Sequence, residues 1–299
     1  MNDLLLTSHS EYLPLQTVWI RPPDNAGWSQ PAIATQWQAL NYLEPPEPMR
    51  ARKQHAELES LLRAVVPEVR VMASGAALSL DSVYCRDASI ATDYGMILCR
   101  MGKAARTGEP ALHREVFESS GIPILGAIEP PGTLEGGDVA WLTPELLAVG
   151  HSYRTNAVGI AQLTALLAPK GVEVLPVDLP HFRGPSDVFH LMSILSPVDL
   201  DLAVVYAPLM PIGFRTRLKD LGFRLVEVPE AEFDTLGSNV LALAPRHCLM
   251  AAGNPQTEEA LRRAGCKVQA YAGREISLKG GGGPTCLTRP WRRRVEPIL

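Results

Sequence analysis

The sequence predicts an α/β protein in which a pair of strands and one helix recur along the chain. Short segments that are rich in β-branched residues and bounded by Gly, Pro or Asn are typical of strands, and they outnumber the helical segments. The strands recur in pairs between helices, as in 139–149 and in 240–251. A doubly wound sheet would usually show one strand per helix. The pairs therefore favour a unit of about 50–60 residues, and five such units would fill the chain.

The first elements are a strand at 17–20 and a Pro-rich segment, 22–48, with little periodicity. We predict a long loop or lid for this segment, because loops of that length are often functional. Its Asp24, Asn25 and Trp28 are candidates for substrate contact. Helical spacing then covers 49–66 and ends before Pro67.

The rest of the chain alternates short predicted strands with short predicted helices. The strands are 69–72, 82–86, 96–100, 122–127, 139–142, 146–149, 172–177, 189–195, 202–206, 224–227, 240–244, 248–251, 267–271 and 285–288. The helices are 111–120, 156–167, 211–221 and 257–264.

Composition and charge narrow the class of protein. The 299 residues are 46% hydrophobic and 20% charged, which are ordinary globular values. The length fits one large domain or two small ones, and we predict a single domain over 1–299. A pI of about 6.0 argues against nucleic-acid binding, which a strongly basic domain would indicate. We expect the one basic run, Arg289 with Arg292–Arg294, to be a solvated tail.

The first residues and the cysteines indicate a cytoplasmic protein. The start carries an acid at position 3 and only a short apolar run, unlike a signal peptide. No segment approaches the roughly 20 apolar residues of a membrane span. The five cysteines are odd in number and lack CxxC spacing, which argues against a disulfide framework and a cysteine zinc site. A reducing compartment fits best.

Four short motifs contain the residues that could perform chemistry. They are SVYCRD at 82–87, LEGGD at 134–138, HLMS at 190–193 and KGGGGPTC at 279–286. Taken singly, each has an ordinary interpretation: a surface ion pair, a turn with two solvated acids, a core histidine and a buried cysteine. The glycine run lacks the GK[ST] ending of a phosphate-binding loop.

Taken together, the motifs indicate an active site. Four glycines let the backbone approach a ligand closely just before Cys286. His190 and the acids Asp87 and Glu135 lie upstream, on or beside apolar strands. This is the inventory of a thiolate nucleophile, a proton shuttle and cation-binding carboxylates.

The motifs DSVYCRD, LEGGDV, SYRTN, HLMS and GGGPTC, in this order between Asp81 and Thr288, resemble those of the guanidine-modifying superfamily, the penteins. Within it they are similar to the dimethylarginine dimethylaminohydrolases (dimethylargininases). The resemblance covers about two thirds of the chain. It implies a five-bladed α/β-propeller of ββαβ units with pseudo-fivefold symmetry, which agrees with the recurring strand pairs.

The resemblance also implies roles for individual residues. Cys286 matches the nucleophile, and His190 matches the general acid and base. Glu135 matches the acid that holds the guanidinium, and Asp87 and Asp81 match further acids that bind it.

Other positions would bind the rest of the substrate. Arg106 and Arg154 match two arginines that grip the substrate's carboxylate, and Gly280 belongs to the glycine run beside the nucleophile. Arg86 occupies a position where dimethylargininases commonly have a Glu that helps bind the α-ammonium group. Arg86-Asp87 resembles the deiminase version instead, so recognition of an α-amino acid stays open.

The chemistry of a guanidinium explains why these residue types are needed. Carboxylates match its planar fork of N–H donors. A thiolate attacks the central carbon, the histidine protonates the leaving amine, and water then releases a ureido product from a covalent thiouronium. An adjacent cation lowers a thiol pKa, so the bound substrate would help to form the thiolate. The family mechanism needs no metal and no cofactor.

Met192 bears on which guanidine is the substrate. Residues two apart on a strand share a face, so Met192 is expected beside His190. Deiminases and amidinotransferases have an Asp there. An acid facing a dimethylated nitrogen would be unpaired, at a cost of about 1–3 kcal/mol, whereas Met tolerates methyl groups or simply fills core.

The sequence therefore predicts hydrolysis of a methylated arginine to citrulline and a methylamine. An arginine deiminase or amidinotransferase, a non-catalytic binder of guanidino ligands and a nucleotide-binding α/β protein are the alternatives. The expected partner is a small guanidino substrate, with no membrane or nucleic acid, and a homo-oligomer stays open.

Overall fold

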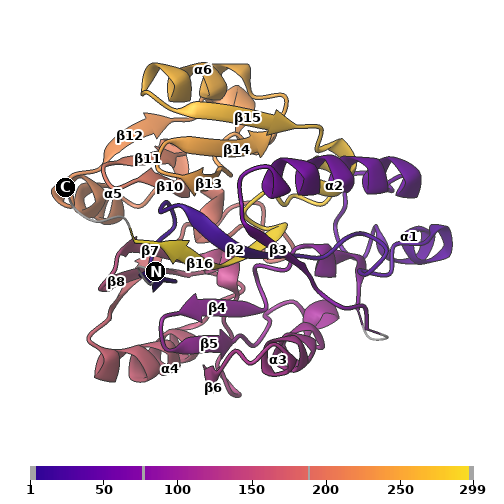
Figure 1. Cartoon of the computed structure of the whole chain (residues 1–299), viewed down its shortest axis with the longest axis horizontal. Helices are drawn as coiled ribbons and strands as arrows, with labels where there is room; N and C mark the ends of the chain where they lie inside the picture. Colours follow the sequence, from indigo (N-terminus) through magenta and orange to yellow (C-terminus); the bar gives the residue numbers. More distant parts are fainter. Residues whose placement is uncertain (1–4, 76–77, 188, 296–299) are drawn as a thin grey trace.

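Five small β-sheets make up the centre of the molecule, and Figure 1 shows helices α2–α6 at its periphery. The computed structural model describes residues 5–75, 78–187 and 189–295. Four of the sheets have three strands, and the fifth has four strands drawn from both ends of the chain.

The four three-stranded sheets repeat one pattern. The first strand pairs antiparallel with the second, and the second pairs parallel with the third after a helix. The strands are β4 (Ser89–Thr92), β5 (Gly95–Leu98), β6 (Ile124–Ala127); β7 (Val139–Thr143), β8 (Leu146–His151), β9 (Glu173–Asp178); β10 (Leu195–Asp199), β11 (Leu202–Val205), β12 (Arg224–Glu227); β13 (Leu241–Ala244), β14 (His247–Ala251) and β15 (Lys267–Tyr271). The connecting helices are α3 (Glu109–Ser119), α4 (Ala157–Leu167), α5 (Ile212–Asp220) and α6 (Pro255–Arg263).

The fifth sheet joins the two ends of the chain. Its order is β1 (Leu6–Thr7), β16 (Thr288–Arg294), β2 (Leu15–Ile20) and β3 (Glu68–Val71). The C-terminal β16 pairs antiparallel with β2, and β2 pairs parallel with β3 after α2 (Pro48–Arg63). This sheet therefore repeats the pattern of the other four, with β16 as its first strand.

The first strand of each sheet lies on the inside of a ring. Contacts join β16 to β4, β7 to β10, β10 to β13 and β13 to β2. An isolated bridge between Arg100 and Leu134 links the β4–β6 sheet to the β7–β9 sheet. The predicted fold class, a five-bladed α/β-propeller of ββαβ units, is confirmed.

Local sequence explains where the helices begin and which face they bury. The side chain of Asn156 caps α4 by accepting from the backbone N–H of Gly159. Proline occupies the first turn of α2 and α6, where its missing N–H removes no helical bond. Apolar side chains at helical spacing then pack on the sheets, as Leu58 and Leu62 of α2 do.

Three predicted strands are wrong, and each error lies next to a candidate site residue. Within 82–86 the chain forms a turn after a 3₁₀ helix, Leu80–Val83. Within 189–195 it forms the 3₁₀ helix Leu191–Ser193 before β10. Residues 285–287 form a turn, and β16 begins at Thr288. The apolar residues that suggested strands are buried, but they belong to turns, and these turns place the candidate site side chains near the propeller axis.

The N-terminal loop prediction is wrong in part. Segment 22–48 contains a helix, α1 (Gln30–Gln36). Trp28 is buried, and its indole N–H donates to the backbone oxygen of Leu80. The Asn25 side chain donates to the backbone oxygen of Met72, and Asp24 pairs with Arg52. These three side chains therefore bind the protein itself rather than lining the candidate cavities.

The prediction of a solvated C-terminal arginine tail is also wrong. The run belongs to β16, and Arg289 and Arg293 are buried. A strand that pairs with β1 on one side and β2 on the other brings its inward side chains to the propeller axis.

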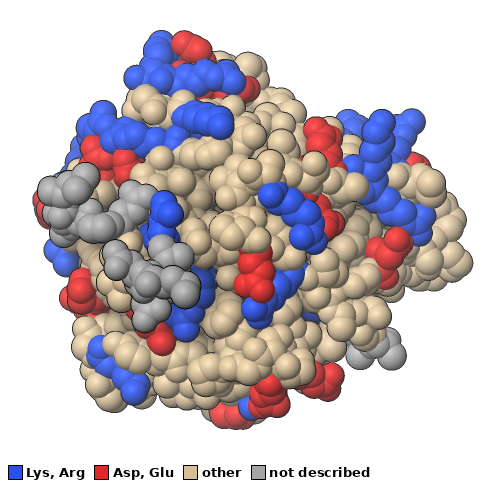
Figure 2. All heavy atoms as spheres, viewed as in Figure 1, with Lys and Arg blue, Asp and Glu red and all other residues tan. Residues whose placement is uncertain are grey.

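The surface carries mixed charges. Figure 2 shows basic and acidic side chains interspersed on one face, with large uncharged areas between them. None of the helices among the described residues is long and apolar enough to cross a membrane. The single domain over 1–299 stays a prediction.

Candidate active site

The five loops that precede the inner strands meet at one end of the propeller axis. Each loop presents a polar side chain a few residues before its strand. These side chains are Asp87 before β4, Glu135 before β7, His190 before β10, Asn239 before β13 and Cys286 before β16. Pseudo-fivefold repetition thus brings together residues that are far apart in the sequence.

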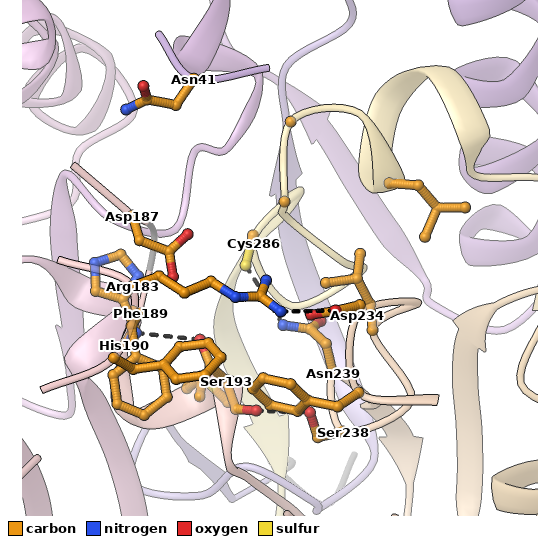
Figure 3. Close-up of a pocket in the computed structure, with 18 of the residues that line it drawn as sticks. Asn41, Arg183, Asp187, Phe189, His190, Ser193, Asp234, Ser238, Asn239 and Cys286 are labelled. Atoms are coloured by element: carbon orange, nitrogen blue, oxygen red, sulfur yellow. Dashed lines mark hydrogen bonds and ion pairs between the residues drawn. The ribbon is translucent and has the colours of Figure 1, made fainter. Parts of the chain in front are cut away.

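Two adjoining cavities surround these residues. A wide cavity of about 210 Å³ has mixed apolar and polar walls, and Figure 3 shows Cys286 close to Asn239, with His190 to their left beyond Asp187 and Arg183. A small cavity of about 20 Å³ lies deeper, among the acids Asp81, Asp87 and Glu135. His190, Gly280, Gly281 and Cys286 line both cavities. The candidate nucleophile and the candidate acid/base therefore stand where the cavities join.

Glu135 and His190 form a buried hydrogen-bonded pair. The distance from Nε2 of His190 to Oε2 of Glu135 is 2.9 Å. Oε1 of Glu135 accepts from the backbone N–H groups of Gly102 and Lys103, both at 3.0 Å. These bonds fix both oxygens of a carboxylate that is completely buried.

The contact between Glu135 and His190 shifts the pKa of each group. Burial opposes the charged imidazolium, but Asp138, the Glu135 hydrogen bond and Asp87 outweigh it and raise the pKa of His190 to about 9. Burial would raise the pKa of Glu135, but the hydrogen bond and the charge of His190 lower it. At neutral pH the pair is therefore an imidazolium beside a carboxylate, with a proton available for a leaving amine.

The turn after His190 is held by a second buried acid. Oδ1 of Asp138 accepts from the backbone N–H of Leu191 at 3.0 Å, and Ser152 donates to Oδ2 at 2.6 Å. Gly137 packs between His190 and Asp87, because a Cβ there would lie 2.5 Å from Nδ1 of His190 and 2.7 Å from Oδ1 of Asp87. The glycine pair of the LEGGD motif thus permits a close approach that another side chain would prevent.

Cys286 is partly exposed to the cavities. Burial and the nearby Asp87 raise the pKa of its thiol, while Thr285 and Asn239 oppose the rise. Nδ2 of Asn239 donates to the sulfur at 3.5 Å. In the free protein the sulfur is therefore a thiol at neutral pH, and a cation bound beside it would favour the thiolate.

The two arginines expected at the far end of the substrate lie against the acids instead. Arg106 is buried, and its guanidinium contacts Asp87 at 2.5 Å and Glu109 at 2.7 Å. Arg154 lies 3.8 Å from Oε1 of Glu135. Both line the small cavity. A buried guanidinium pairs with the nearest carboxylates, which the motif spacing alone could not indicate.

Asp81 and Arg86 are also engaged by the protein. Asp81 lines the small cavity and binds the ammonium group of Lys103 at 2.6 Å. Arg86 lies outside both cavities, completely buried, and its Nη2 contacts Glu11 at 2.7 Å. The expectation that Arg86 binds substrate is therefore wrong, because its side chain turns away to a carboxylate near the N-terminus.

Met192 lies in the wide cavity with His190, as expected, but the reason given by the sequence was wrong. The two residues belong to a 3₁₀ turn and not to a strand. Phe182, Phe189 and Phe233 line the same cavity. Polar side chains share this part of the wall, since Arg183, Asp187 and Ser193 line the same cavity.

Two polar residues of the site were missed by the sequence analysis. Asn239 contacts the sulfur, and Lys103 reaches Asp81. Position 239, just before the predicted strand 240–244, was the available signal, since Glu135 likewise lies shortly before a predicted strand, 139–142. No sequence feature indicated that Lys103 belongs to the site, because its position there depends on its contact with Asp81.

The acids and the histidine could also hold a cation of another kind. The ligand atoms of Asp87, Glu135 and His190 lie within 4.8 Å of one another. However, His190 already binds Glu135, and Arg106 already binds Asp87. These three side chains would suit a planar cation that takes the place of their present partners at least as well as they would suit a metal ion.

Known proteins with similar sequences include arginine deiminases and a dimethylarginine dimethylaminohydrolase. The family model described as "Arginine deiminase" matches residues 79–220 and 212–293. The arginine deiminase of Listeria welshimeri is 28% identical over 249 residues, which cover 69% of this chain and 60% of that protein. The N(G),N(G)-dimethylarginine dimethylaminohydrolase of Streptomyces coelicolor is 33% identical over 181 residues, 60% of this chain and 63% of that protein. The chain thus spans about 60% of the length of the curated deiminases it matches.

Solved structures support the fold. A DDAH from Pseudomonas aeruginosa complexed with citrulline superposes with a TM-score of 0.75 at 23% identity, covering 93% of this chain and all of that one. The N-terminal domain of ArgZ, an arginine dihydrolase from cyanobacteria, gives a TM-score of 0.76 at 21% identity, covering 95% of this chain and 98% of that one. Identities this low establish the shared fold alone.

Proposed function

The chain belongs to the arginine deiminase family, and from this premise we propose that it hydrolyses a C–N bond of a guanidino compound through a covalent intermediate on Cys286. The observation that carries the proposal is the junction of the two cavities, where Cys286 and His190 meet a group of buried carboxylates. Oδ1 of Asp87 has no hydrogen-bond partner among the described residues, so a planar cation could bind it directly, whereas a contact with Glu135 or Asp81 would compete with Arg154 or Lys103.

The first half of the reaction forms the intermediate. The substrate guanidinium binds between Asp87 and Glu135, and its charge lowers the thiol pKa of Cys286, so that the thiol proton leaves to solvent. The thiolate attacks the central carbon and forms a tetrahedral adduct. Protonated His190 gives its proton to the leaving nitrogen, the C–N bond breaks, and an amine departs from a thiouronium on the sulfur.

The second half releases the product. Neutral His190 now accepts a proton from a water molecule as the water oxygen attacks the thiouronium carbon. The C–S bond then breaks, the hydroxyl proton passes to solvent as the carbonyl forms, a neutral ureido product leaves, and Cys286 is released as a thiolate. The raised pKa of His190 suits both steps, because the group is protonated at rest and becomes a strong base after it has donated.

We propose an N-methylated arginine as the preferred substrate. Met192 and the three phenylalanines contribute apolar surface to the wide cavity, and no acid stands at position 192. A dimethylated nitrogen has no N–H to offer, so an acid at position 192 would be desolvated without a partner, at a cost of about 1–3 kcal/mol. Because Arg86 turns away to Glu11, any recognition of an α-amino group must come from other residues.

Product analysis tests this proposal. Purified protein is supplied with dimethylarginine or arginine, and citrulline and the released amine are quantified between about pH 6 and 9, where a thiolate–histidine pair is active. We expect turnover of dimethylarginine to exceed turnover of arginine.

Met192→Asp should shift kcat/KM toward arginine by about tenfold or more, since one unpaired buried polar group is worth that factor. The control Met192→Leu should keep the wild-type preference. A preference for arginine in the wild-type protein would contradict the methylated substrate.

The arginine deiminase relatives favour a second candidate, deimination of unsubstituted arginine, with amidino transfer as a variant of it. Ammonia and citrulline from arginine would indicate a deiminase, and a new guanidino product in the presence of an acceptor amine would indicate a transferase. A non-catalytic binder would bind dimethylarginine equally well as wild type and as Cys286→Ser, with no turnover in either.

A further inference from the structure

A second group of buried charges lies on the propeller axis beyond the active site. It consists of Glu11, between β1 and β2, Arg86, before β4, and Arg289 and Arg293, both on β16. Their side chains are between 1% and 6% exposed. The active-site chemistry described above uses none of the four.

The group contains three cations and one anion. Guanidinium groups stay protonated in proteins, so the net charge is +3 − 1 = +2. Burial lowers the pKa of Arg289 to about 9 and that of Arg293 to about 10, with Arg86 adding to the effect and Glu11 opposing it. Buried charges are ordinarily paired, and here two positive charges lack a carboxylate among the described residues.

The hydrogen bonds of these arginines are incomplete in the same way. Arg86 donates from Nη2 to Glu11 and to the backbone oxygen of Val139, while its Nε and Nη1 find no acceptor among the residues described. Arg293 donates from Nη1 to the backbone oxygens of Leu13 and Ala242, while its Nε and Nη2 find none. Arg289 is better satisfied, by the backbone oxygens of Ser89 and Pro290.

A small cavity adjoins this group. Its volume is about 10 Å³, and its lining includes Glu11, Arg289, Trp291 and Arg293 together with the hydroxyl-bearing Ser8 and Ser10. The indole N–H of Trp291 is also buried without an acceptor in the described part of the chain. No residue of this lining belongs to either active-site cavity. The cavity is therefore a separate place.

Size limits what the cavity can hold. A volume of about 10–15 Å³ accommodates one particle the size of a water molecule, which excludes phosphate, sulfate and carboxylate ligands. The lining has two arginines, Arg289 and Arg293, against one carboxylate, Glu11, and this net positive charge favours an anion over a neutral particle. A halide ion satisfies both limits, because it is monatomic and accepts hydrogen bonds from several directions.

We propose that this cavity is a binding site for one chloride-sized monatomic anion, bounded by Arg293, Arg289 and Trp291. The ion neutralises part of the excess charge where β16 crosses the axis. Because β16 joins the C-terminal end of the chain to β1 and β2, an ion bound there stabilises the sheet that closes the ring. Its effect is on the folded state and is independent of turnover.

Thermal unfolding at constant ionic strength tests the site. The midpoint is measured while chloride replaces gluconate, an anion too large for the cavity, up to about 0.2 M; a ligand that binds only the folded state raises the midpoint with its concentration. We expect chloride and bromide to raise the midpoint by several degrees relative to gluconate. Equal midpoints in all three salts would overturn the proposal.

Matched variants locate the effect. Arg293→Gln should lose the dependence on chloride, whereas Arg292→Gln should keep it, because Arg292 pairs with Asp93 and lies outside the cavity lining. Loss of the dependence in both variants, or in neither, would overturn the assignment.

Crystals of the wild-type protein grown in bromide supply a readout that needs no variant to fold. An anomalous peak within contact distance of Arg293 and Trp291 is the expected result. Absence of a peak there, or peaks confined to the surface, would overturn the proposal.

Discussion

At the scale of single residues, Asn239 makes a direct contact with the proposed nucleophile, Cys286. Its Oδ1 accepts from the backbone N–H and the hydroxyl of Thr285, at 3.1 and 2.9 Å. These two bonds fix the amide so that Nδ2 points at the sulfur of Cys286. A donor aimed at a developing thiolate stabilises the charged form, so Asn239 is a positioning residue for the proposed nucleophile.

Replacing Asn239 by Ala should therefore raise the pKa of the Cys286 thiol. The rate of alkylation by iodoacetamide, followed against pH, should rise at higher pH than in the wild type, and kcat should fall by about tenfold, the worth of one hydrogen bond to a charged group. Ser238→Ala is the control, because its hydroxyl bonds to the backbone oxygen of Ser193 and not to the sulfur. An unchanged alkylation profile in Asn239→Ala would show that the contact has no effect on the thiol.

The roles of single residues could be predicted from the sequence only where they belong to a recognisable motif. The types and order of Cys286, His190, Glu135 and Asp87 indicated a guanidino site, and the structure brings them to the joined cavities. The partners of Arg86 were not readable, since Glu11 lies far away along the chain. A motif carries local chemistry, whereas a buried ion pair depends on which strands become neighbours.

At the scale of elements, the strand pairs and helices were predictable and the turns between them were not. Alternating or continuous apolar runs marked β5–β9 and β11–β15 within a few residues. The segment around His190 is equally apolar, but it folds as a tight turn in which Asp138 accepts from the backbone N–H of Leu191. The segment before Cys286 is a glycine run, and Asn239 accepts from the backbone N–H of Thr285 at its end. Periodicity cannot distinguish a buried turn from a buried strand, and the functional residues lie in such turns.

Helix α2 carries a buried histidine that makes stability depend on pH. Burial lowers the pKa of His55 to about 4, and its Nε2 has no hydrogen-bond partner among the described residues. A histidine whose folded pKa is below the unfolded value contributes full stability above about pH 6.5, and that contribution is lost as the pH falls toward 4.

His55→Leu should remove this acid sensitivity. Relative to the wild type, the variant should be about 2 kcal/mol more stable against unfolding at pH 5 than at pH 7.5. This value follows from a folded pKa of about 4 and an unfolded pKa of 6.5 for His55. Urea unfolding at the two pH values measures the difference. A constant difference between variant and wild type would mean that His55 takes up no extra proton on unfolding.

At the scale of the whole molecule, the ring closes through a sheet built from both ends of the chain. Strand β2 lies between β16 and β3, and Val18 at its centre is completely buried. The backbone N–H of Met72, just after β3, donates to the backbone oxygen of Ile20 at the end of β2. Backbone groups two residues apart on a strand point to the same side, so the N–H of Val18 also points toward β3. The five motifs indicated this architecture from the sequence, but only by resemblance, because the repeats share element order and not residues.

Val18→Pro should destabilise the whole ring. Proline removes a ladder bond and leaves a buried carbonyl unpaired, which should lower the thermal midpoint by about 10 °C at roughly 2–4 °C per kcal/mol. Val71→Pro is the matched control: Val71 is exposed on edge strand β3, and its N–H points away from β2. Similar midpoints for the two variants would contradict closure of the ring through β2.

The convergence of five loops on one thiol is the claim on which the proposed chemistry depends, and mass spectrometry of protein quenched in acid during turnover of dimethylarginine tests it most directly. The account predicts a mass increase equal to the substrate minus its leaving amine, located on the peptide that contains Cys286 and absent from Cys286→Ser. Turnover with no adduct on Cys286, or with the adduct on another residue, would contradict it.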